Sequence, residues 1–508
     1  MTRAGYILAI DQGTTGTTAL LVDGSGRVVW QTSQEIEQIY PQPGWVEHDP
    51  EDLFDSCLAV VDELLEETET DPRQIEAVGI ANQRETTLVW DRETGEPMYN
   101  AVVWQCRRSA PLCEAMKAQG LEAMVRARTG LPIDAYFSAT KLRWLLDAIP
   151  NGQRRAESGE LAFGTVDSWL LWKLTNGAIH ATDTTNASRT MLYDIDRLKW
   201  DPQLLSALDI PVALLPEVRP SSGVLGHLSG ELFGGQGVPI AGMAGDQHAA
   251  LFGQACFQPG MVKNTYGTGS FVLTNTGPNR VQSGSGMIST IAWQIGDEVT
   301  YALEGSIFAT GSTVQWLRDG LGLIAEASET DALARTVPDN GGVYLVPAFT
   351  GLGTPHWDMD ARGAILGITR GTTRGHFARA ALESTAYQTR DVVEAISKDT
   401  GQGVSLLRVD GGGTASELMM QFQADILGIP TERSAMPETT ALGAAYLAGL
   451  AVGFWNDLEE IADHWRSDGR FEPAMVDVER ERLYLGWQRA VLRTLRRAEV
   501  APAPASCS

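Results

Sequence analysis

The chain has 508 residues, 43% of them hydrophobic, which is enough apolar material for more than one core and predicts two or three domains. Its 39 Lys and Arg residues against 64 Asp and Glu residues give a formal net charge of −25, which disfavours nucleic acid and anionic membranes as partners. The five cysteines are odd in number and form no C-x-x-C pair, which argues against a disulfide framework and against a zinc site.

The N-terminal segment predicts a β-hairpin with a small polar turn. Apolar runs over 6–10 and 19–22 flank the sequence DQGTTGTT, in which Gly and Thr dominate. Glycines let a backbone approach a ligand closely, and successive N–H groups in such a turn form a concavity that binds anions. Asp11 follows the first run, where a carboxylate could hold Mg²⁺ through water molecules. An ordinary tight hairpin is the alternative interpretation.

A charged pair follows the next predicted strand, 75–81. Arg84 and Glu85 are adjacent, and a donating guanidinium beside an accepting carboxylate could bind neighbouring hydroxyls of a small polyol. A solvated charge pair in a loop is the competing interpretation. Helices are predicted over 121–128 and 141–149 because their apolar residues recur at helical spacing.

The segment GMAGDQHAALFG places Asp246 directly before a helical run. Asp246 could be the N-cap of that helix, or it could act as a general base toward a hydroxyl nucleophile. Gln247 would donate or accept a hydrogen bond beside it. The seven histidines have no metal-binding spacing such as H-E-x-x-H and are interpreted as structural.

A second Gly- and Thr-rich turn, in VKNTYGTGS, lies about halfway along the chain. It too stands between two strand-like runs, which suggests two similar halves. Chain breakers in FGQACFQPG place the domain boundary near 253–260. We therefore expect an N-terminal domain over 1–253, a C-terminal domain over 254–500 and a disordered tail over 501–508.

Strand and helix signals continue to alternate in the second half, which is typical of an α/β protein. Strands are predicted over 342–347 and 406–410, and helices over 374–398 and 417–427. A third Gly cluster, VDGGGTASELMMQF, joins the last of these strands to the last helix. The N-terminus of that helix suits an anion or the edge of a nucleotide, although Ser416 could instead be a capping residue.

No membrane span or signal peptide is predicted. The longest apolar run, 441–455, is too short and Gly-rich to cross a bilayer, and it predicts a buried helix. The N-terminal apolar run ends at Asp11, too early for a signal peptide. With the cysteine pattern, these features favour a cytoplasmic protein without stable membrane insertion.

The three Gly-rich turns together suggest nucleotide phosphates held by backbone N–H groups, although the common motif G-x-x-x-x-G-K-[ST] is absent. Many segments resemble the FGGY carbohydrate kinase family. They are DQGTTGTT, GWVEHDP, NQRETT, VVWQCRR, FGTVDSWLLWKLT, TDTTNASRTML, AGDQHAALFGQ, NTYGTGSF, VPAFTGLGTPHWD and ALGAAYLAGLAVGFW. The resemblance runs from about Tyr6 to Trp487, and NQRETT and VVWQCRR are similar to the glycerol branch of the family.

The resemblance implies two actin-like ATPase domains with RNase H-like cores and an interdomain active-site cleft. It implies ATP-dependent phosphorylation of glycerol to sn-glycerol 3-phosphate with Mg²⁺, by in-line transfer that depends on alignment and electrostatic stabilisation. It further implies a homodimer or homotetramer. A kinase for another polyol or ketose, and a non-catalytic actin-like ATP-binding protein, are the alternatives.

The same resemblance implies the roles of individual residues. Asp246 would be the general base, and Asp11 would support Mg²⁺. Glycerol would be bound by Arg84, Glu85, Trp104, Tyr136, Asp246, Gln247 and Phe271. The nucleotide would be contacted by Thr14, Thr15, Gly16, Thr18, Thr268, Gly311, Gln315, Gly412 and Ser416.

Some positions depart from the family pattern. Members usually carry Ser at Gly16 and Arg at Thr18, and the loss of that Arg removes a charged phosphate contact. The segment ELFGGQGVPI lacks the Arg that some members use for fructose 1,6-bisphosphate, and Leu232 stands where others have a phosphorylatable His. We therefore expect neither form of control in this chain.

Overall fold

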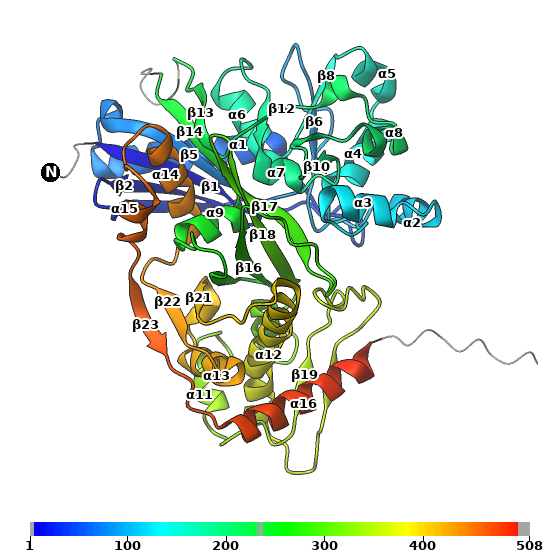
Figure 1. Cartoon of the computed structure of the whole chain (residues 1–508), viewed down its shortest axis with the longest axis vertical. Coiled ribbons are helices and arrows are strands. Elements are labelled where there is room, and N and C mark those ends of the chain that lie inside the picture. The colour runs from blue at the N-terminus through cyan, green and yellow to red at the C-terminus, as the bar shows by residue number, and fades with distance from the viewer. Residues whose placement is uncertain (1–4, 231, 233–236, 496–508) are drawn as a thin grey trace, which may run out of the picture.

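A computed structural model describes residues 5–230, 232 and 237–495 of the chain. One mixed β-sheet of 13 strands runs through the whole molecule and is packed between helices (Figure 1). Its strand order is β23-β22-β21-β15-β16-β18-β17-β13-β14-β5-β1-β2-β3. The α/β class predicted from the alternating strand and helix signals is confirmed.

The strands of this sheet are bounded as follows: β1 (Tyr6–Gln12), β2 (Gly16–Asp23), β3 (Val28–Glu35), β5 (Ile75–Asn82), β13 (Ser222–His227), β14 (Pro239–Gly245), β15 (Val262–Tyr266), β16 (Ser270–Gly277), β17 (Ile288–Ile295), β18 (Glu298–Ile307), β21 (Leu407–Asp410), β22 (Thr431–Ser434) and β23 (Ser467–Phe471). The short strands outside it are β4 (Glu47–His48), β6 (Leu88–Asp91), β7 (Ala101–Val102), β8 (Leu161–Gly164), β9 (Ala181–Asp183), β10 (Tyr193–Asp194), β11 (Lys199–Trp200), β12 (Glu217–Arg219), β19 (Tyr344–Val346) and β20 (Ala364–Leu366).

The two halves of the large sheet repeat one pairing pattern. In the first half, β1 pairs antiparallel with β2 and parallel with β5, and β5 pairs parallel with β14. In the second half, β15 pairs antiparallel with β16 and parallel with β21, and β21 pairs parallel with β22. Both Gly- and Thr-rich turns are therefore hairpin tips, as predicted. The two similar halves suggested by these turns are present in the topology.

The helices are α1 (Pro50–Thr68), α2 (Ala110–Ala118), α3 (Glu122–Thr129), α4 (Ser138–Ala148), α5 (Gly152–Glu157), α6 (Val166–Leu174), α7 (Thr184–Ser188), α8 (Pro202–Ala207), α9 (Asp246–Gly253), α10 (Gly311–Asp319), α11 (Glu329–Ala334), α12 (Arg374–Thr400), α13 (Glu417–Leu427), α14 (Thr439–Ala451), α15 (Leu458–Ala462) and α16 (Asp477–Thr494). Three short 3₁₀ turns are η1 (Pro72–Gln74), η2 (Val212–Leu214) and η3 (Gly412–Ala415). The helices predicted over 121–128, 141–149, 374–398 and 417–427 correspond to α3, α4, α12 and α13.

The central strands of the first half separate two hydrophobic cores. Successive side chains of a strand point to opposite faces of the sheet, so Leu8 and Ile10 of β1 pack with α1 and α6. Ile7 and Ala9 pack on the other face with α9 and α14. This sandwich fixes β1 and β5, whose carboxyl ends carry polar residues of the predicted site.

Helix α14 approaches its neighbours so closely that only glycine fits at the contacts. A Cβ built on Gly443 of α14 would lie 1.8 Å from the carbonyl oxygen of Ala249 in α9. A Cβ on Gly79 of β5 would lie 2.2 Å from the carbonyl oxygen of Ala444. Gly443 and Gly79 therefore serve the packing of this helix, and the buried helix predicted within 441–455 is confirmed.

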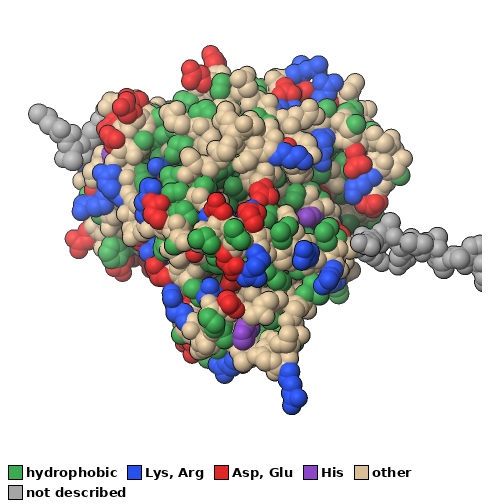
Figure 2. All heavy atoms as spheres, turned by 60° about the horizontal axis from the view of Figure 1, so that its bottom comes forward, with side chains coloured by type: hydrophobic (Ala, Val, Ile, Leu, Met, Phe, Trp, Pro, Cys, Tyr) green, Lys and Arg blue, Asp and Glu red, His purple; other side chains and the backbone are tan. Residues whose placement is uncertain are grey.

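No described helix is long and apolar enough to cross a membrane. The four described cysteines, Cys57, Cys106, Cys113 and Cys256, are buried and free of disulfides. On the face drawn in Figure 2, basic side chains are scattered among acidic ones. The predicted tail 501–508, with Cys507, and residues 231 and 233–236 of the segment ELFGGQGVPI lie outside the described residues.

Candidate active site

The candidate site is built where two parallel strands end side by side. Arg84 follows β5, and Asp246 begins α9 directly after β14; the last residues of these strands, Asn82 and Gly245, are paired. Arg84 Nε therefore lies 2.9 Å from Asp246 Oδ1. The side chain of Arg84 is 2% exposed, but that of Asp246 is 28% exposed, so a ligand can reach the carboxylate.

Local geometry directs Arg84 and Asp246 to the same point. Gly245 is the N-cap of α9, so Asp246 is the first helical residue, and the N-cap interpretation of Asp246 is wrong. A Cβ on Gly245 would lie 2.6 Å from Arg84 Cγ, which means that Arg84 needs a glycine there. The Asp246 carboxylate accepts from the backbone N–H of Gln247 at 2.6 Å through Oδ1. Its Oδ2 has only a longer contact, 3.3 Å from Gln247 Nε2.

A buried ion network lies behind Arg84. Its Nη1 donates to Glu304 Oε2 at 2.5 Å, and Arg189 binds both Glu304 Oε1, at 3.0 Å, and Glu85 Oε1, at 2.6 Å. All four side chains are at most 2% exposed. Burial alone would raise the pKa of Glu304, but the two guanidinium groups hold it well below its usual range. The solvated-pair interpretation of Arg84 and Glu85 is therefore wrong.

Three aromatic side chains lie beside this charged cluster. Tyr136 Oη is 3.5 Å from Arg84 Nη2, and the ring of Phe271 lies 5.5 Å from the Arg84 guanidinium carbon. The ring of Trp104 makes edge contacts with Tyr136 and Phe271, at centroid distances of 5.6 and 6.4 Å. These rings can pack against the carbon chain of a small ligand while the charged groups bind its hydroxyls.

The first Gly- and Thr-rich turn is joined to this aromatic group. Trp104 Nε1 donates to Thr14 Oγ1 at 2.8 Å, and the N–H of Gly13 donates to the carbonyl of Gly16 at 2.9 Å. Thr15 at the tip is exposed. Thr18 lies further along β2, and its hydroxyl is 2.9 Å from Ser33 Oγ on β3. Thr18 is therefore tied to the neighbouring strand.

The second turn lies against the start of α10. The backbone N–H of Gly311 donates to the carbonyl of Gly267 at 3.0 Å, and that of Ser312 donates to the carbonyl of Thr268 at 3.1 Å. Gln315 is exposed one turn along α10. The structure thus brings Thr268, Gly311 and Gln315 together at one end of the second half.

The third turn joins the second through Gly411. This residue has a φ of 85°, and a Cβ there would lie 2.6 Å from the carbonyl oxygen of Tyr266, so glycine allows the close approach. Gly412 is exposed beside it. Ser416 caps α13 by accepting from the N–H of Met419 at 3.1 Å, and its hydroxyl also donates to Asp331. The capping interpretation of Ser416 is confirmed.

Asp11 has the properties expected of a residue that supports a cation. Its Oδ1 is buried and has no hydrogen-bond partner. Burial, followed by the charges of Asp246 and Glu438, raises the pKa of Asp11 well above its usual value. Among the described residues no group of three or more His, Cys, Asp and Glu side chains could hold a metal ion. A single carboxylate of this kind fits Mg²⁺, which keeps several waters and shares its shell with phosphate oxygens.

Comparison with known proteins decides the family. The model of the FGGY family of carbohydrate kinases matches residues 6–253 with its N-terminal domain and residues 262–452 with its C-terminal domain. The chain belongs to this family. The boundary predicted at 253/254 falls at the end of the first match, and the predicted domain limits stay a prediction.

Full-length relatives of this FGGY kinase are highly similar. The chain is 59% identical to glycerol kinase 2 of Thermotoga maritima, in an alignment that covers 96% of this chain and 99% of the relative. It is 59% identical to a glycerol kinase of Stenotrophomonas maltophilia, over 96% and 98%. The solved structure of Plasmodium falciparum glycerol kinase with ADP has a TM-score of 0.90 at 38% identity and covers 97% of this chain and 99% of that one. A xylulose kinase from Lactobacillus acidophilus, at 22% identity and a TM-score of 0.86, shares the fold.

Sequence reasoning missed three charged residues of the candidate site. Glu304 is an acidic residue within a run of buried positions in β18, and that anomaly was an available signal. Arg189 lies in TDTTNASRTML without an assigned role, and Lys263 is the second residue of β15, the strand that leads into the second turn. Their partners are distant in sequence, so only the fold brings them to Arg84 and Gln247.

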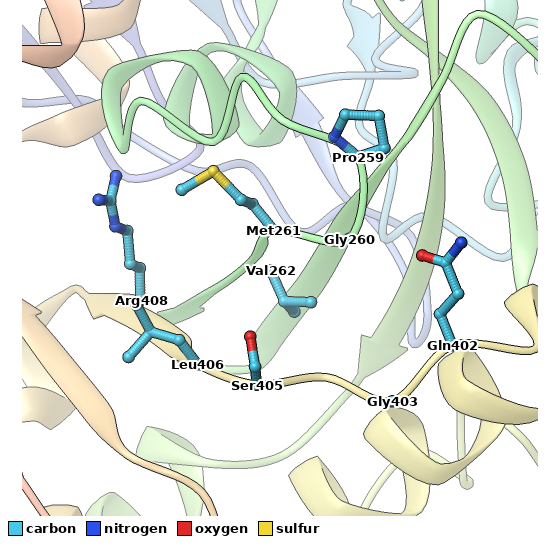
Figure 3. A pocket seen from close by; sticks show the side chains of 9 residues that line it. All are labelled: Pro259, Gly260, Met261, Val262, Gln402, Gly403, Ser405, Leu406 and Arg408. Atoms are coloured by element: carbon cyan, nitrogen blue, oxygen red, sulfur yellow. The ribbon is translucent and has the colours of Figure 1, made fainter.

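A cavity of about 230 Å³ lies away from these residues. Figure 3 shows Met261, Gln402, Ser405 and Arg408 among its lining residues, at the beginning of β15 and β21. The Gly-rich turns follow the opposite ends of the same strands. This cavity is therefore not the nucleotide site predicted for the FGGY kinase.

Proposed function

We propose that this FGGY kinase transfers the γ-phosphoryl group of ATP to glycerol and forms sn-glycerol 3-phosphate. The observation that carries the proposal is the Arg84–Asp246 pair, with a partly exposed carboxylate between buried cations and three aromatic rings. Identity of 59% to relatives named glycerol kinase supports the choice of glycerol among polyols.

In this proposal Asp246 is the general base. Its Oδ1 is occupied by Arg84 and by the N–H of Gln247, so Oδ2 is the oxygen that takes the proton of the attacking hydroxyl. The hydroxyl oxygen forms its bond to the γ-phosphorus as the bond from that phosphorus to the β–γ bridging oxygen breaks, and ADP leaves. Arg84, Glu85, Tyr136 and Gln247 orient the hydroxyls, and Trp104 and Phe271 contact the carbon chain.

The nucleotide is assigned to the three turns. The first turn and the strand after it contribute Thr14, Thr15, Gly16 and Thr18. The second turn and the start of α10 contribute Thr268, Gly311 and Gln315. The third turn contributes Gly412 and Ser416. Asp11 would hold Mg²⁺ through water, and the bound cation would neutralise charge on the transferring phosphates. Ser416 already caps α13, so of these residues it has the least freedom to bind a ligand. The homodimer or homotetramer and the cytoplasmic location expected from the resemblance stay predictions.

The proposal is tested by phosphoryl transfer from Mg·ATP with the purified chain. Glycerol, erythritol, xylulose and ribulose are compared with a control without acceptor, and each product is identified by mass. Glycerol 3-phosphate as the dominant product is expected. Preference for xylulose or ribulose would indicate a ketose kinase instead. ATP hydrolysis that no acceptor changes would favour the non-catalytic, actin-like alternative.

A further inference from the structure

Lys263 is a buried cation to which the proposed mechanism assigns no part. It lies on β15, its side chain is 0% exposed, and its Nζ is 2.6 Å from Gln247 Oε1 and 2.9 Å from Thr265 Oγ1. Within the described part of the chain no carboxylate forms an ion pair with it. An ammonium buried without a carboxylate partner is unfavourable for stability. Its position therefore points to a role in the site.

The contact with Lys263 decides which way the Gln247 amide faces. An ammonium group has donors and no acceptor, whereas the amide of Gln can present either its oxygen or its NH₂ group. Lys263 therefore requires the oxygen of Gln247 on its own side. The NH₂ group then faces Asp246, with Nε2 3.3 Å from Oδ2. Without Lys263, the amide could rotate and place two oxygen acceptors side by side.

The charges around Lys263 support this arrangement. Asp410 and Asp246 favour its protonated form, while Arg84 disfavours it. Burial is the largest influence and lowers the pKa of Lys263 to about 8. The residue is therefore mostly charged at neutral pH, as a donor to Gln247 must be. Asp410, which pairs with Thr265 across β15 and β21, directly precedes the third Gly-rich turn.

We propose that Lys263 is a positioning residue that fixes Gln247 as a hydrogen-bond donor toward the attacking hydroxyl. This inference rests on the proposed function. The NH₂ group of Gln247 would donate to the hydroxyl oxygen while the hydroxyl proton points at Asp246 Oδ2. The two side chains would then orient a lone pair of that oxygen away from both of them, toward the γ-phosphorus.

The test is a double-mutant cycle of Lys263→Met and Gln247→Ala, because Met has a similar length but no charge and no donor. Each single variant is expected to lower kcat/KM for glycerol about tenfold or more, with KM for ATP unchanged. In the Gln247→Ala background, Lys263→Met should cost less than about twofold. The proposal would be overturned if the effects of the two substitutions on kcat/KM multiplied as independent effects do. It would also be overturned if KM for ATP rose by the same factor by which kcat/KM for glycerol fell. Lys173→Met, which removes a cation paired with Glu51 away from the site, is the control and should leave kcat/KM unchanged.

Gln247→Glu tests the donor role of Gln247, on which the proposal depends, even if Lys263→Met does not fold. A carboxylate can pair with Lys263, so the melting temperature should be kept, but it cannot donate to the hydroxyl. Its kcat/KM for glycerol should fall at least as far as that of Gln247→Ala, and wild-type values would overturn the proposal because the site would then need no donor at position 247. A wild-type chain without glycerol turnover would overturn the proposed function as well, whereas an active wild type with independent effects overturns only this inference.

Discussion

Arg84 and Glu304 form a buried two-point ion pair, with Arg84 Nη1 2.5 Å from Glu304 Oε2 and Arg84 Nη2 3.3 Å from Glu304 Oε1. Arg84 belongs to the segment matched by the N-terminal family domain, and Glu304 to the segment matched by the C-terminal one. The residue that binds Asp246 is thus itself held by the other half of the chain. Any change in the relative position of the halves at this point acts directly on Arg84.

Replacing Glu304 should damage both stability and activity. Glu304→Gln removes the negative charge shared by Arg84 and Arg189 and leaves two buried guanidinium groups with one carboxylate fewer. Breaking a buried ion pair from one side costs about 3–5 kcal/mol in the free energy of unfolding. We expect a clear fall in melting temperature by calorimetry and a lower kcat with glycerol.

The matched control for Glu304→Gln is Glu472→Gln. Glu472 pairs with Arg470 at 2.7 Å, but both side chains are exposed, so the pair is screened by solvent. Its loss should leave the melting temperature unchanged. Equal effects of the two substitutions would contradict the importance assigned to the buried network.

A single methyl group at Gly245 should displace Arg84. The Cβ of Gly245→Ala would lie 2.6 Å from Arg84 Cγ and 2.7 Å from Cδ, so the guanidinium must move away from Asp246. We expect kcat/KM for glycerol to fall about tenfold or more, with binding of ADP kept. Gly223→Ala on β13 is the control, because no atom lies within 4 Å of its built Cβ. Unchanged kinetics for Gly245→Ala would show that Arg84 need not hold its observed position.

The hairpin turns and helices α12 and α13 could be predicted because their signals are local, whereas the local patterns at Arg84 and Asp246 left two interpretations of each open. Gly and Thr residues between two apolar runs indicate a turn whether that turn is buried or exposed. The burial of Arg84 could not be predicted, since it depends on Glu304 and Arg189, which lie 220 and 105 positions away in the chain. Local statistics of charged pairs favour solvent exposure, and here the tertiary contacts prevailed.

Two assignments, the N-cap of α9 and the role of Lys263, could not be made from sequence patterns alone. An acidic residue before a helical run fits both the N-cap and the first helical position, and only the backbone distinguishes Gly245 from Asp246 as the cap. The role of Lys263 depends on the side of the Gln247 amide that faces it. Spacing along the chain holds no information on that orientation, whereas the contact of 2.6 Å does.

The buried Asp167 should make stability depend on pH. Burial, and then the charge of Asp183, raises the pKa of Asp167 to about 7, whereas it is about 4 in an unfolded chain. Between the two pKa values the native state keeps Asp167 protonated, whereas the unfolded chain has lost that proton. The contribution of Asp167 to the free energy of unfolding therefore falls as pH rises from about 4 to about 7. Above that range it is constant.

Asp167→Asn should remove this dependence. The melting temperature of the variant relative to wild type should rise between pH 5 and pH 8, as measured by calorimetry at several pH values. Asp71→Asn is the control, because Asp71 is exposed and Arg73 lowers its pKa to about 2, outside the window. A constant difference between Asp167→Asn and wild type would show that Asp167 does not titrate in this range.

Asp11 should destabilise the ligand-free chain and contribute to the binding of Mg²⁺. Its buried Oδ1 has no partner, so Asp11→Asn removes an unfavourable carboxylate and should raise the melting temperature without ligand by a degree or more, on the order expected for about 1 kcal/mol. The same change should reduce the extra stabilisation that ADP with Mg²⁺ gives over ADP alone. Calorimetry with each ligand set measures both effects. If Asp11→Asn kept the full Mg²⁺-dependent shift, the assignment of Asp11 to the cation would be wrong.

Asp246 should be required for turnover and dispensable for nucleotide binding. Asp246→Asn keeps an oxygen that can accept from Arg84 Nε, so the local geometry is retained, but an amide cannot take the proton of the attacking hydroxyl. We expect kcat to fall by about a hundredfold or more, the range of general-base catalysis, while the Kd for ADP measured by calorimetry stays within about twofold. Because Asn can still form hydrogen bonds with glycerol but cannot accept its proton, the glycerol KM should change less than kcat. Substantial turnover by Asp246→Asn would assign the proton transfer to another group, and equal losses in kcat and ADP affinity would indicate a disordered site instead of a missing base.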